Sequence, residues 1–555
     1  MKKIQIIFFA TILFSSIISC KKQLEVKNPN QPIPESAITE AGTIALAQGG
    51  IYRNGFRDLK YSDGVYGFFW SGAIGFHEMM GDAIQVEAAN AFINQIGCPD
   101  KVTLDNGTVV LNPNSPNTQK ALVRNVVNFN SNQGQNTLYY EWAYMYSMIN
   151  ACNTILYTVE KTSFLSEAAT KKATIQAWAY WWKGFAYARI GSIYYAGVIN
   201  NSDGAIVNNT AGKTNANYVT KEAIISESNR VLDLATAALN TVTTVTAYNE
   251  VLGKLIPSFC QVGKGGILTT DMWKRNINTL KARNILVNTP VATMTADQWT
   301  SILTLTNDGV LATDKVFTGR SNTAGDFLSA TSGTVASKVQ SALAGGNTYK
   351  LSERLVQDFK PGDKRLANNV AQTVTWIGNG DRGHVFNTRY RLINKGTGLA
   401  GVKVYTNTDA GGEETFLAGS FEENELMKAE ALIYTGSIDA GLALIDAVRN
   451  SQGAGLSAVS GTGLTLTEAK EELRRERRVA LPFIGLSFYD ARRWGIINPV
   501  SEGGGRTGAV VITGSGAVNT NATIEYNFLD YWDVPDNELV YNPPSAGSAP
   551  VKNPK

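Results

Sequence analysis

Aromatic and polar residues that suit ligand binding are concentrated between Tyr66 and Asp82, in the stretch YGFFWSGAIGFHEMMGD. Aromatic faces can stack on the apolar faces of a ligand, while imidazole and carboxylate groups exchange hydrogen bonds with its polar groups. The run of rings between glycines fits neither an amphipathic helix nor a strand, so some of the rings are expected at the surface. The predicted ligand contacts are Phe68, Trp70, His77, Asp82 and, in a glycine-rich segment farther along the chain, Trp376.

A core position is the competing interpretation for every ring in this stretch. We favour it for Phe69 and Phe76, and we also expect Trp299 to pack against a neighbouring helix. For Trp70 and Trp376 the two interpretations remain open. An alanine substitution distinguishes them, because a stacking ring supports binding whereas a core ring supports stability.

Fragments of catalytic motifs occur, but none is complete. His77-Glu78 begins like the zinc-protease motif H-E-x-x-H, yet Gly81 stands where the second histidine belongs, and His384 is the only other histidine. The segment from Gly378 to Gly383 matches G-x-G-x-x-G, but a strand is expected after it, which favours a hairpin turn over a dinucleotide site. A carboxylate pair for glycoside hydrolysis stays open, because the separation of the two groups depends on the fold. The sequence predicts no metal site and no cofactor.

An arginine-rich segment runs from Arg474 to Gly495, RRERRVALPFIGLSFYDARRWG. A helix is expected up to Ala480, a break at Pro482 and Gly485, and a second helix after the break. Arginine pairs bidentately with carboxylates and stacks on rings. The segment is therefore predicted to lock two helices together, in preference to forming a ligand or catalytic patch.

The elements that position these residues are expected to be mainly helical. Long loops are expected at 94–135 and 313–346, where asparagine, glycine, serine and threonine follow no clear period, and a small β element is expected at 370–405. Apolar periodicity and bounding turn residues predict helices at 36–53, 138–159, 168–195, 221–239, 272–287, 295–307, 420–451 and 467–494.

The first residues have the features of a lipoprotein leader. Two lysines precede an apolar stretch that is too short to span a membrane and ends at Ile17-Ile18-Ser19-Cys20, which resembles a lipobox. We expect residues 1–19 to be a signal peptide, Cys20 to be lipidated, and residues 20–35 to form a tether. An ordinary cleaved leader with a coincidental cysteine is the alternative.

Charge and cysteine content exclude several classes of protein. The chain has 50 basic and 47 acidic residues, and loss of Lys2 and Lys3 with the leader leaves an almost neutral mature chain. No nucleic-acid partner is indicated. The remaining cysteines, Cys98, Cys152 and Cys260, are odd in number and lack metal-ligand spacing, so no disulfide framework is expected.

The arginine-rich segment resembles the C-terminal signature of the SusD/RagB family of Bacteroidetes outer-membrane lipoproteins, E-R-R-x-E-L-x-F-E-G-x-R-x-x-D-L-R-R-W-G. The segment departs from this signature at Pro482, Ile484 and Ser487. Further stretches that resemble family motifs, spread over most of the chain, are 142–153, 355–366, 425–449 and 534–543.

This resemblance implies a mainly α fold with tetratricopeptide-like helix pairs, a loop-rich irregular half and a small β element. In this interpretation residues 36–555 form a single domain, with helix pairs at about 36–310 and 420–495 and an irregular or β insertion at about 311–419. It also places the segment around Gly81-Asp82 near the ligand-facing half.

The family resemblance further implies a nutrient-binding lipoprotein of the outer membrane, facing the cell surface, rather than an enzyme. Its partners would be an oligosaccharide or a peptide and a SusC-like TonB-dependent transporter. Lys21-Lys22 follow Cys20 where outward-facing members often have acidic residues, so a periplasmic orientation stays open. A peptide- or glycopeptide-binding protein and a secreted glycan-active enzyme are the alternative functions.

Overall fold

A computed structural model describes residues 38–53, 56, 69–86, 92–201, 216–320, 349–376, 386–407, 409 and 411–555. The leader, Cys20 and most of the predicted tether lie outside these residues. The described chain is mainly helical, which confirms the predicted fold class. None of its helices is long and apolar enough to cross a membrane.

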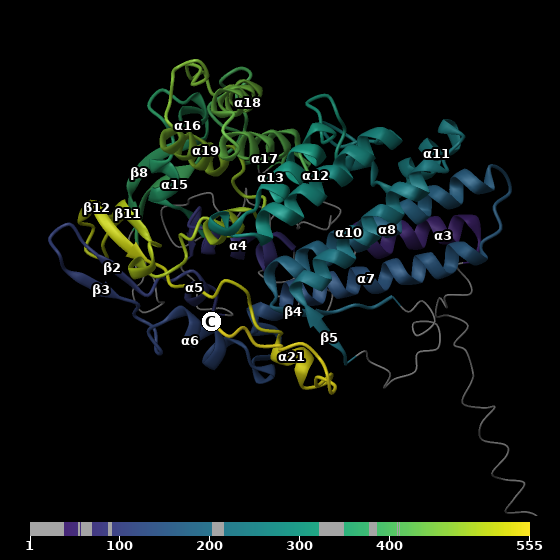
Figure 1. The fold of residues 1–555 in the computed structure, drawn as a ribbon, viewed down its shortest axis with the longest axis horizontal. Coiled ribbons are helices and arrows are strands. Elements are labelled where there is room, and N and C mark those ends of the chain that lie inside the picture. The colour runs from purple at the N-terminus through teal and green to yellow at the C-terminus, as the bar shows by residue number, and fades with distance from the viewer. Residues whose placement is uncertain are drawn as a thin grey trace, which may run out of the picture.

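Long helices form one end of the molecule, where α7, α8 and α10 run side by side (Figure 1). The helices predicted between residues 138 and 307 are confirmed, with ends that differ by no more than two residues. The helices are α3 (Glu40–Ala47), α4 (Gly75–Met80), α5 (Ile93–Ile96), α6 (Gln119–Leu122), α7 (Thr137–Lys161), α8 (Ala168–Ile193), α10 (Lys221–Asn240), α11 (Val245–Leu255), α12 (Thr270–Asn288), α13 (Ala296–Asn307), α15 (Glu353–Gln357), α16 (Lys364–Asn369), α17 (Phe421–Tyr434), α18 (Ile438–Ser451), α19 (Leu466–Ala480), α20 (Ser487–Arg493) and α21 (Asp536–Leu539).

Side-chain caps define where many of these helices begin. Thr295 and Thr465 each form a capping box with the residue three positions later, and Asn136, Thr220 and Ser420 accept a backbone N–H of the first turn. These caps satisfy amide groups that have no partner inside the helix. The ends of the helices are therefore fixed locally by the sequence.

Small residues allow α8 to pack closely against α10. A Cβ atom at Gly184 would lie 2.8 Å from Leu232, and one at Gly191 would lie 2.9 Å from Ile225, so neither position has room for a side chain. Around the other side of α8, Trp178, Trp181 and Trp182 form a buried aromatic cluster with edge-to-face contacts. The long helices thus share one continuous core.

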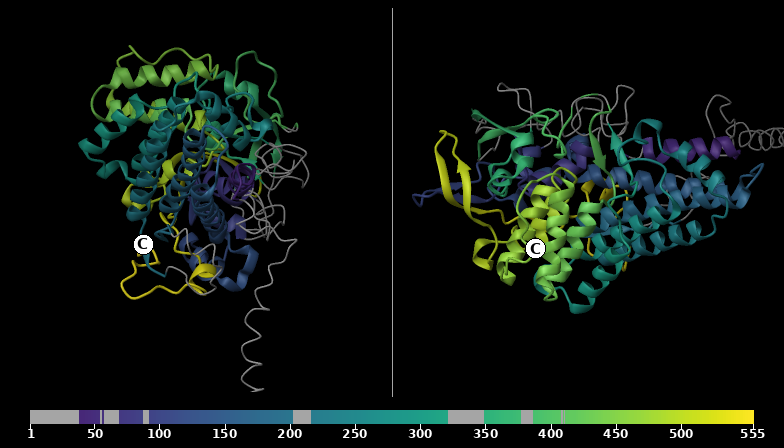
Figure 2. Two further views of the ribbon diagram at one scale, coloured as in Figure 1. Left: turned by 90° about the vertical axis from the view of Figure 1, so that its right-hand side faces the viewer. Right: turned by 90° about the horizontal axis from the view of Figure 1, so that it is seen from above.

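The helical segment predicted from 420 to 451 is two helices. Gly436, with a φ of 92°, ends α17 and lets the chain turn into α18, because only glycine adopts this backbone conformation without strain. Helices α17, α18 and α19 pack on one another. They lie between the long helices and the hairpin of β11 (Arg506–Ile512) and β12 (Val518–Glu525), as Figure 2 shows.

Short strands complete the fold. The predicted hairpin is confirmed as β8 and β9, whereas the four-stranded antiparallel sheet β11-β12-β2-β3, at the opposite end from the long helices (Figure 2), was not predicted. The residues between β8 and β9, including Gly378–Gly383, lie outside the described part of the chain. The strands are β1 (Ile84–Val86), β2 (Lys101–Thr103), β3 (Val109–Leu111), β4 (Ala196–Val198), β5 (Tyr218–Thr220), β6 (Thr318–Arg320), β7 (Tyr349–Leu351), β8 (Val370–Trp376), β9 (Thr388–Leu392), β10 (Glu414–Phe416), β11 (Arg506–Ile512) and β12 (Val518–Glu525).

Candidate functional site

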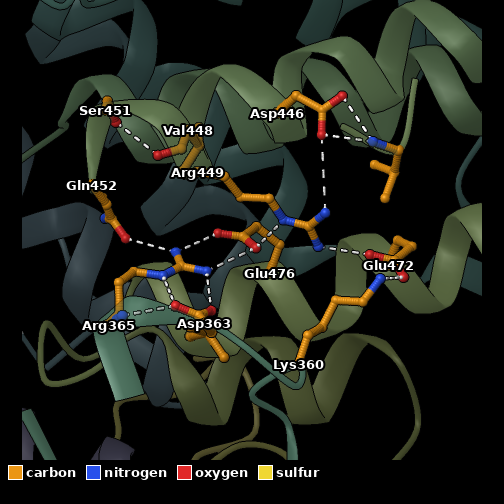
Figure 3. Close-up of polar contacts among 12 residues, drawn as sticks. Lys360, Asp363, Arg365, Asp446, Val448, Arg449, Ser451, Gln452, Glu472 and Glu476 are labelled. Carbon is orange, nitrogen blue, oxygen red and sulfur yellow. Dashed lines mark hydrogen bonds and ion pairs between the residues drawn. The ribbon is translucent and has the colours of Figure 1, made fainter. Parts of the chain in front are cut away.

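The arginine-rich segment joins helices through buried ion pairs. Figure 3 shows Glu476 of α19 between two guanidinium groups: Arg365 Nη1 donates to Glu476 Oε1 at 2.6 Å, and Arg449 Nε donates to Glu476 Oε2 at 2.8 Å. Arg365 also pairs with Asp363, and Arg449 with Glu472. These pairs connect α16, α18 and α19.

A second group of buried charges joins α19, α20 and α17. Asp490 accepts from both Arg477 and Arg493, and Arg493 continues to Glu430 at 2.5–2.7 Å. Burial alone would raise the pKa of Asp490, but the neighbouring guanidinium groups overcome this effect and hold it below its usual range. The Trp494 indole N–H donates to Glu430 as well. The structure therefore confirms that this segment locks helices together.

The described residues among the predicted ligand contacts lie in the interior. Trp70 is 1% exposed and its indole N–H donates to the carbonyl oxygen of Phe483. His77 is fully buried beside Glu141, and Asp82 is 5% exposed and pairs with Arg354. A ring that stacks on a sugar needs an open face, and Trp70 offers none in this conformation.

The other predicted contacts are placed only in part. Trp376 is the last residue of β8, and its side chain, like the whole of Phe68, lies outside the described part of the chain. Ligand binding by the predicted residues stays a prediction, which burial disfavours for Trp70 and His77. The core positions expected for Phe69, Phe76 and Trp299 are confirmed.

His77 and Asp82 each have a charged hydrogen-bond partner. His77 Nε2 lies 2.7 Å from Glu141, which also accepts from Arg189 at 2.5 Å. Burial lowers the pKa of His77, so a neutral imidazole that donates to Glu141 is the favoured form. The described residues contain no group of three histidine, cysteine or acidic side chains that could hold a metal ion.

Glu78 holds the turn between α19 and α20. Its carboxylate accepts hydrogen bonds from the backbone N–H groups of Phe483 and Gly485, at 3.0 and 2.8 Å, and from the Ser487 hydroxyl at 2.7 Å. Phe483 has a φ of 70°, a left-handed conformation that costs energy for a residue other than glycine. The buried segment 69–82 thus fixes the turn 481–487 through these hydrogen bonds.

This turn forms part of a groove that we call the β-side groove. Its volume is about 580 Å³, and its walls come from β6, β10, the segment after β9 and the first residues of α17. Its lining residues include Val404, Asn407, Phe416, Glu422, Lys403 and Ile484.

Apolar and polar groups alternate around the β-side groove. Val404 is 43% exposed, and the side chains of Phe416 and Ile484 are half-buried. The ammonium group of Lys403 donates to the carbonyl oxygen of Ala480 at 3.0 Å, and burial lowers its pKa despite the opposing effect of Glu422. Apolar surface beside convergent donors and acceptors is typical of a small-molecule site.

A larger groove lies on the other side of the arginine-rich segment. This C-terminal groove has a volume of about 1140 Å³ and lies between the ends of α8, α12, α19 and α20 and residues 530–555. Aromatic rings line it at four positions, namely Tyr195, Tyr434, Trp494 and Tyr531. Arg474, Arg493 and Trp494 of the arginine-rich segment belong to its wall.

Neither groove was predicted from the sequence. The lining residues of the β-side groove come from segments separated by up to about 220 positions, from Lys264 to Ile484, and none of these segments carries a recognisable motif on that face. The only sequence signal nearby was the break at Pro482 and Gly485, which was read as a helix boundary.

Comparisons with known proteins show a family similarity for the C-terminal part of the chain and a similar fold for most of its length. Residues 423–546 match the model of the SusD family. A SusD-like carbohydrate binding protein from Bacteroides fragilis is 15% identical, with a TM-score of 0.55 over 92% of this chain and 98% of that one. A structure described as being with xylogluco-oligosaccharide is 14% identical, with a TM-score of 0.56 over 92% and 99%.

A SusD-like carbohydrate binding protein from Bacteroides vulgatus is also similar, at 14% identity and a TM-score of 0.52, with 94% of this chain and 98% of that one covered. At these identities the likeness shows a shared fold. The comparison with curated protein sequences finds no match.

Proposed function

We propose that this chain, which belongs to the SusD/RagB family, is an outer-membrane nutrient-binding protein that captures an oligosaccharide and delivers it to a SusC-like TonB-dependent transporter. The β-side groove is the proposed capture site. Binding without chemistry is proposed because the sequence contains no complete catalytic motif, and the described residues contain no group of three side chains that could hold a metal ion.

The composition of the β-side groove is the observation that supports this function. Val404, Phe416 and Ile484 offer apolar surface to the C–H faces of a sugar, while Asn407 and Glu422 can exchange hydrogen bonds with its hydroxyls. Phe483, which lines the groove, is held in place by hydrogen bonds to Glu78 and Trp70. A preformed wall reduces the ordering cost of binding.

Calorimetric titration of the mature protein tests this proposal. The panel contains neutral oligosaccharides, xyloglucan fragments among them, and peptides of similar size. We expect at least one oligosaccharide to bind, and Val404→Arg to weaken it at least tenfold, about 1.4 kcal/mol, because the long cation fills the groove. Val518→Arg is the matched control, since Val518 is 45% exposed and lies on β12, away from the groove.

Two results would contradict the proposal. Binding of peptides without any oligosaccharide would favour the peptide-binding alternative. Turnover of a panel member, abolished by substitution of a single carboxylate, would make the protein an enzyme.

The membrane and transporter parts of the proposal need separate experiments. Cys20→Ala should abolish labelling by a lipid precursor, and protease treatment of intact cells should degrade the wild-type protein. Affinity purification from solubilised membranes should recover a TonB-dependent transporter with it. Complete protease protection would place the protein in the periplasm.

A further inference from the structure

We propose that the C-terminal groove is a second binding site, which takes an oligosaccharide that carries carboxylate groups, such as a chain of uronic acids. This inference goes beyond the proposed function, because it concerns a different groove and a charged class of glycan. It rests on the unpaired cations, the aromatic rings and the size of that groove.

Two cations of the C-terminal groove form no ion pair within the described part of the chain. Arg492 is 7% exposed and donates only to the carbonyl oxygens of Ser192, Val287 and Asp530. Lys470, on α19, lies over an aromatic ring and forms no ion pair within the described part of the chain. Because neither cation forms an ion pair, each keeps part of its attraction for an anion, although the nearby Asp530 carboxylate offsets some of the charge of Arg492.

The other lining cations are already neutralised. Lys221 pairs with Glu222, Arg474 with Glu471 and Asp358, and Lys555 with Asp530. Arg493 is held by the two carboxylates described above. Among the lining carboxylates, Glu502 has no cation within ion-pair distance in the described part of the chain, and it is exposed to solvent, which screens its charge.

The rings of the groove lie beside these cations. The Lys470 ammonium lies 4.2 Å from the centre of the Tyr434 ring, whose other contact is a stacked Trp299 at 4.9 Å. The Arg492 guanidinium lies 4.0 Å from the centre of the Tyr531 ring. Tyr434 is therefore covered by Lys470 and Trp299, and Tyr531 is 7% exposed with Arg492 and Lys221 over its ring. The half-buried rings of Tyr195 and Trp494 remain to stack on a sugar, while the unpaired cations attract its carboxylate.

Size and charge favour a glycan over other anions. The volume of about 1140 Å³ exceeds the roughly 300–1,000 Å³ of a typical small-molecule pocket and suits several linked sugar units. A nucleic acid would need a row of unpaired cations along its phosphates, and only two are present. An acidic peptide shares the carboxylate but lacks the flat apolar rings, and it becomes an outcome of the test.

The test compares oligogalacturonate with its fully methyl-esterified form, which keeps the sugar chain and removes the charge. We expect wild-type protein to bind the acid at least tenfold more tightly than the ester, and Lys470→Glu to abolish this preference. Lys254→Glu, at an exposed position on α11 outside both grooves, should preserve it. Tyr195→Ala should weaken both ligands, and Val404→Arg should leave the preference unchanged.

Thermal unfolding of each variant confirms that it is folded before titration. Equal affinity for acid and ester, a preference that survives Lys470→Glu, or tighter binding of a poly-glutamate peptide than of oligogalacturonate would overturn this inference. If a neutral glycan binds and Val404→Arg blocks it while the acid shows no preference, this inference fails and the proposed function stands. Absence of any glycan binding would defeat both.

Discussion

Replacing Glu476 with glutamine removes a carboxylate that two buried arginines share. Glu476 is 2% exposed and accepts from Arg365 at 2.6 and 3.2 Å and from Arg449 at 2.8 Å. Figure 3 shows its carboxylate between the two guanidinium groups. Glutamine has nearly the same shape, so Glu476→Gln changes charge and hydrogen bonding with little change in packing. Its amide nitrogen would be a donor facing other donors.

The expected loss follows from what each arginine keeps. Breaking a buried ion pair costs about 3–5 kcal/mol when one charge is left alone. Here Arg365 retains Asp363, with Nη2 to Oδ2 at 2.8 Å, and Arg449 retains Glu472, with Nη2 to Oε2 at 2.6 Å. Because neither guanidinium loses all its partners, we expect a destabilisation of about 3 kcal/mol, at the lower end of that range.

Urea denaturation followed by circular dichroism measures this loss, with an unchanged m-value as the check that the same surface unfolds. Glu471→Gln is the matched control on the same helix, since Glu471 is 45% exposed and its pairs with Arg474 and Arg475 are at the surface. It should lose less than about 1 kcal/mol. A loss below about 1 kcal/mol for Glu476→Gln, or an equal loss for both variants, would refute the reasoning.

Three further predictions test the interior of the molecule. Glu78→Ala leaves the N–H groups of Phe483 and Gly485 without an acceptor and should destabilise by about 3–5 kcal/mol in urea titration, whereas Glu78→Gln should lose less than half of that. Because the folded-state pKa of Asp490 lies below its unfolded value of about 3.9, its contribution is present above that pH and lost as pH falls further; Asp490→Asn should flatten the acid limb of stability against pH. Because Trp70 is a core ring, Trp70→Ala should lower the free energy of unfolding by about 3–5 kcal/mol, while Trp376→Ala still tests ligand stacking by titration.

Local signals made the helices predictable. Thr295 and Thr465 precede apolar periodic segments and are followed by a glutamine and a glutamate that complete their capping boxes, so both starts could be read from short stretches. The two-helix nature of 420–451 was missed because its apolar pattern continues across the break. Gly436 alone marks the turn, and an isolated glycine is a weak signal.

The four-stranded sheet was missed for a different reason. Its strand β2 pairs with β12, more than 400 residues away, with Val102 opposite Ile524. Strands of three residues such as β2 and β3 are too short to show alternation, and their pairing depends on the tertiary fold. Long-range pairing of this kind leaves no trace in a local window.

The predicted ligand residues show the same limit. The aromatic run before Asp82 looked exposed because it lacks the spacing of an amphipathic helix, but a helix that is surrounded on all sides needs no polar face. Trp70 begins a π-helical turn, and α4 that follows it is buried throughout. Absence of amphipathic spacing is thus compatible with complete burial as well as with exposure.

The arginine-rich segment also relates the two proposed sites to each other. Its turn, Pro482 to Ile484, lines the β-side groove, while Arg474 and Trp494 on the flanking helices line the C-terminal groove. The pair of Arg477 and Asp490 joins α19 to α20, and the pair of Arg493 and Glu430 joins α20 to α17. A change that loosens these buried pairs should therefore widen or distort both grooves. Glu430→Gln, which touches neither groove directly, should therefore reduce the affinity of neutral and acidic glycans together, and loss of only one affinity would show that the grooves are held independently.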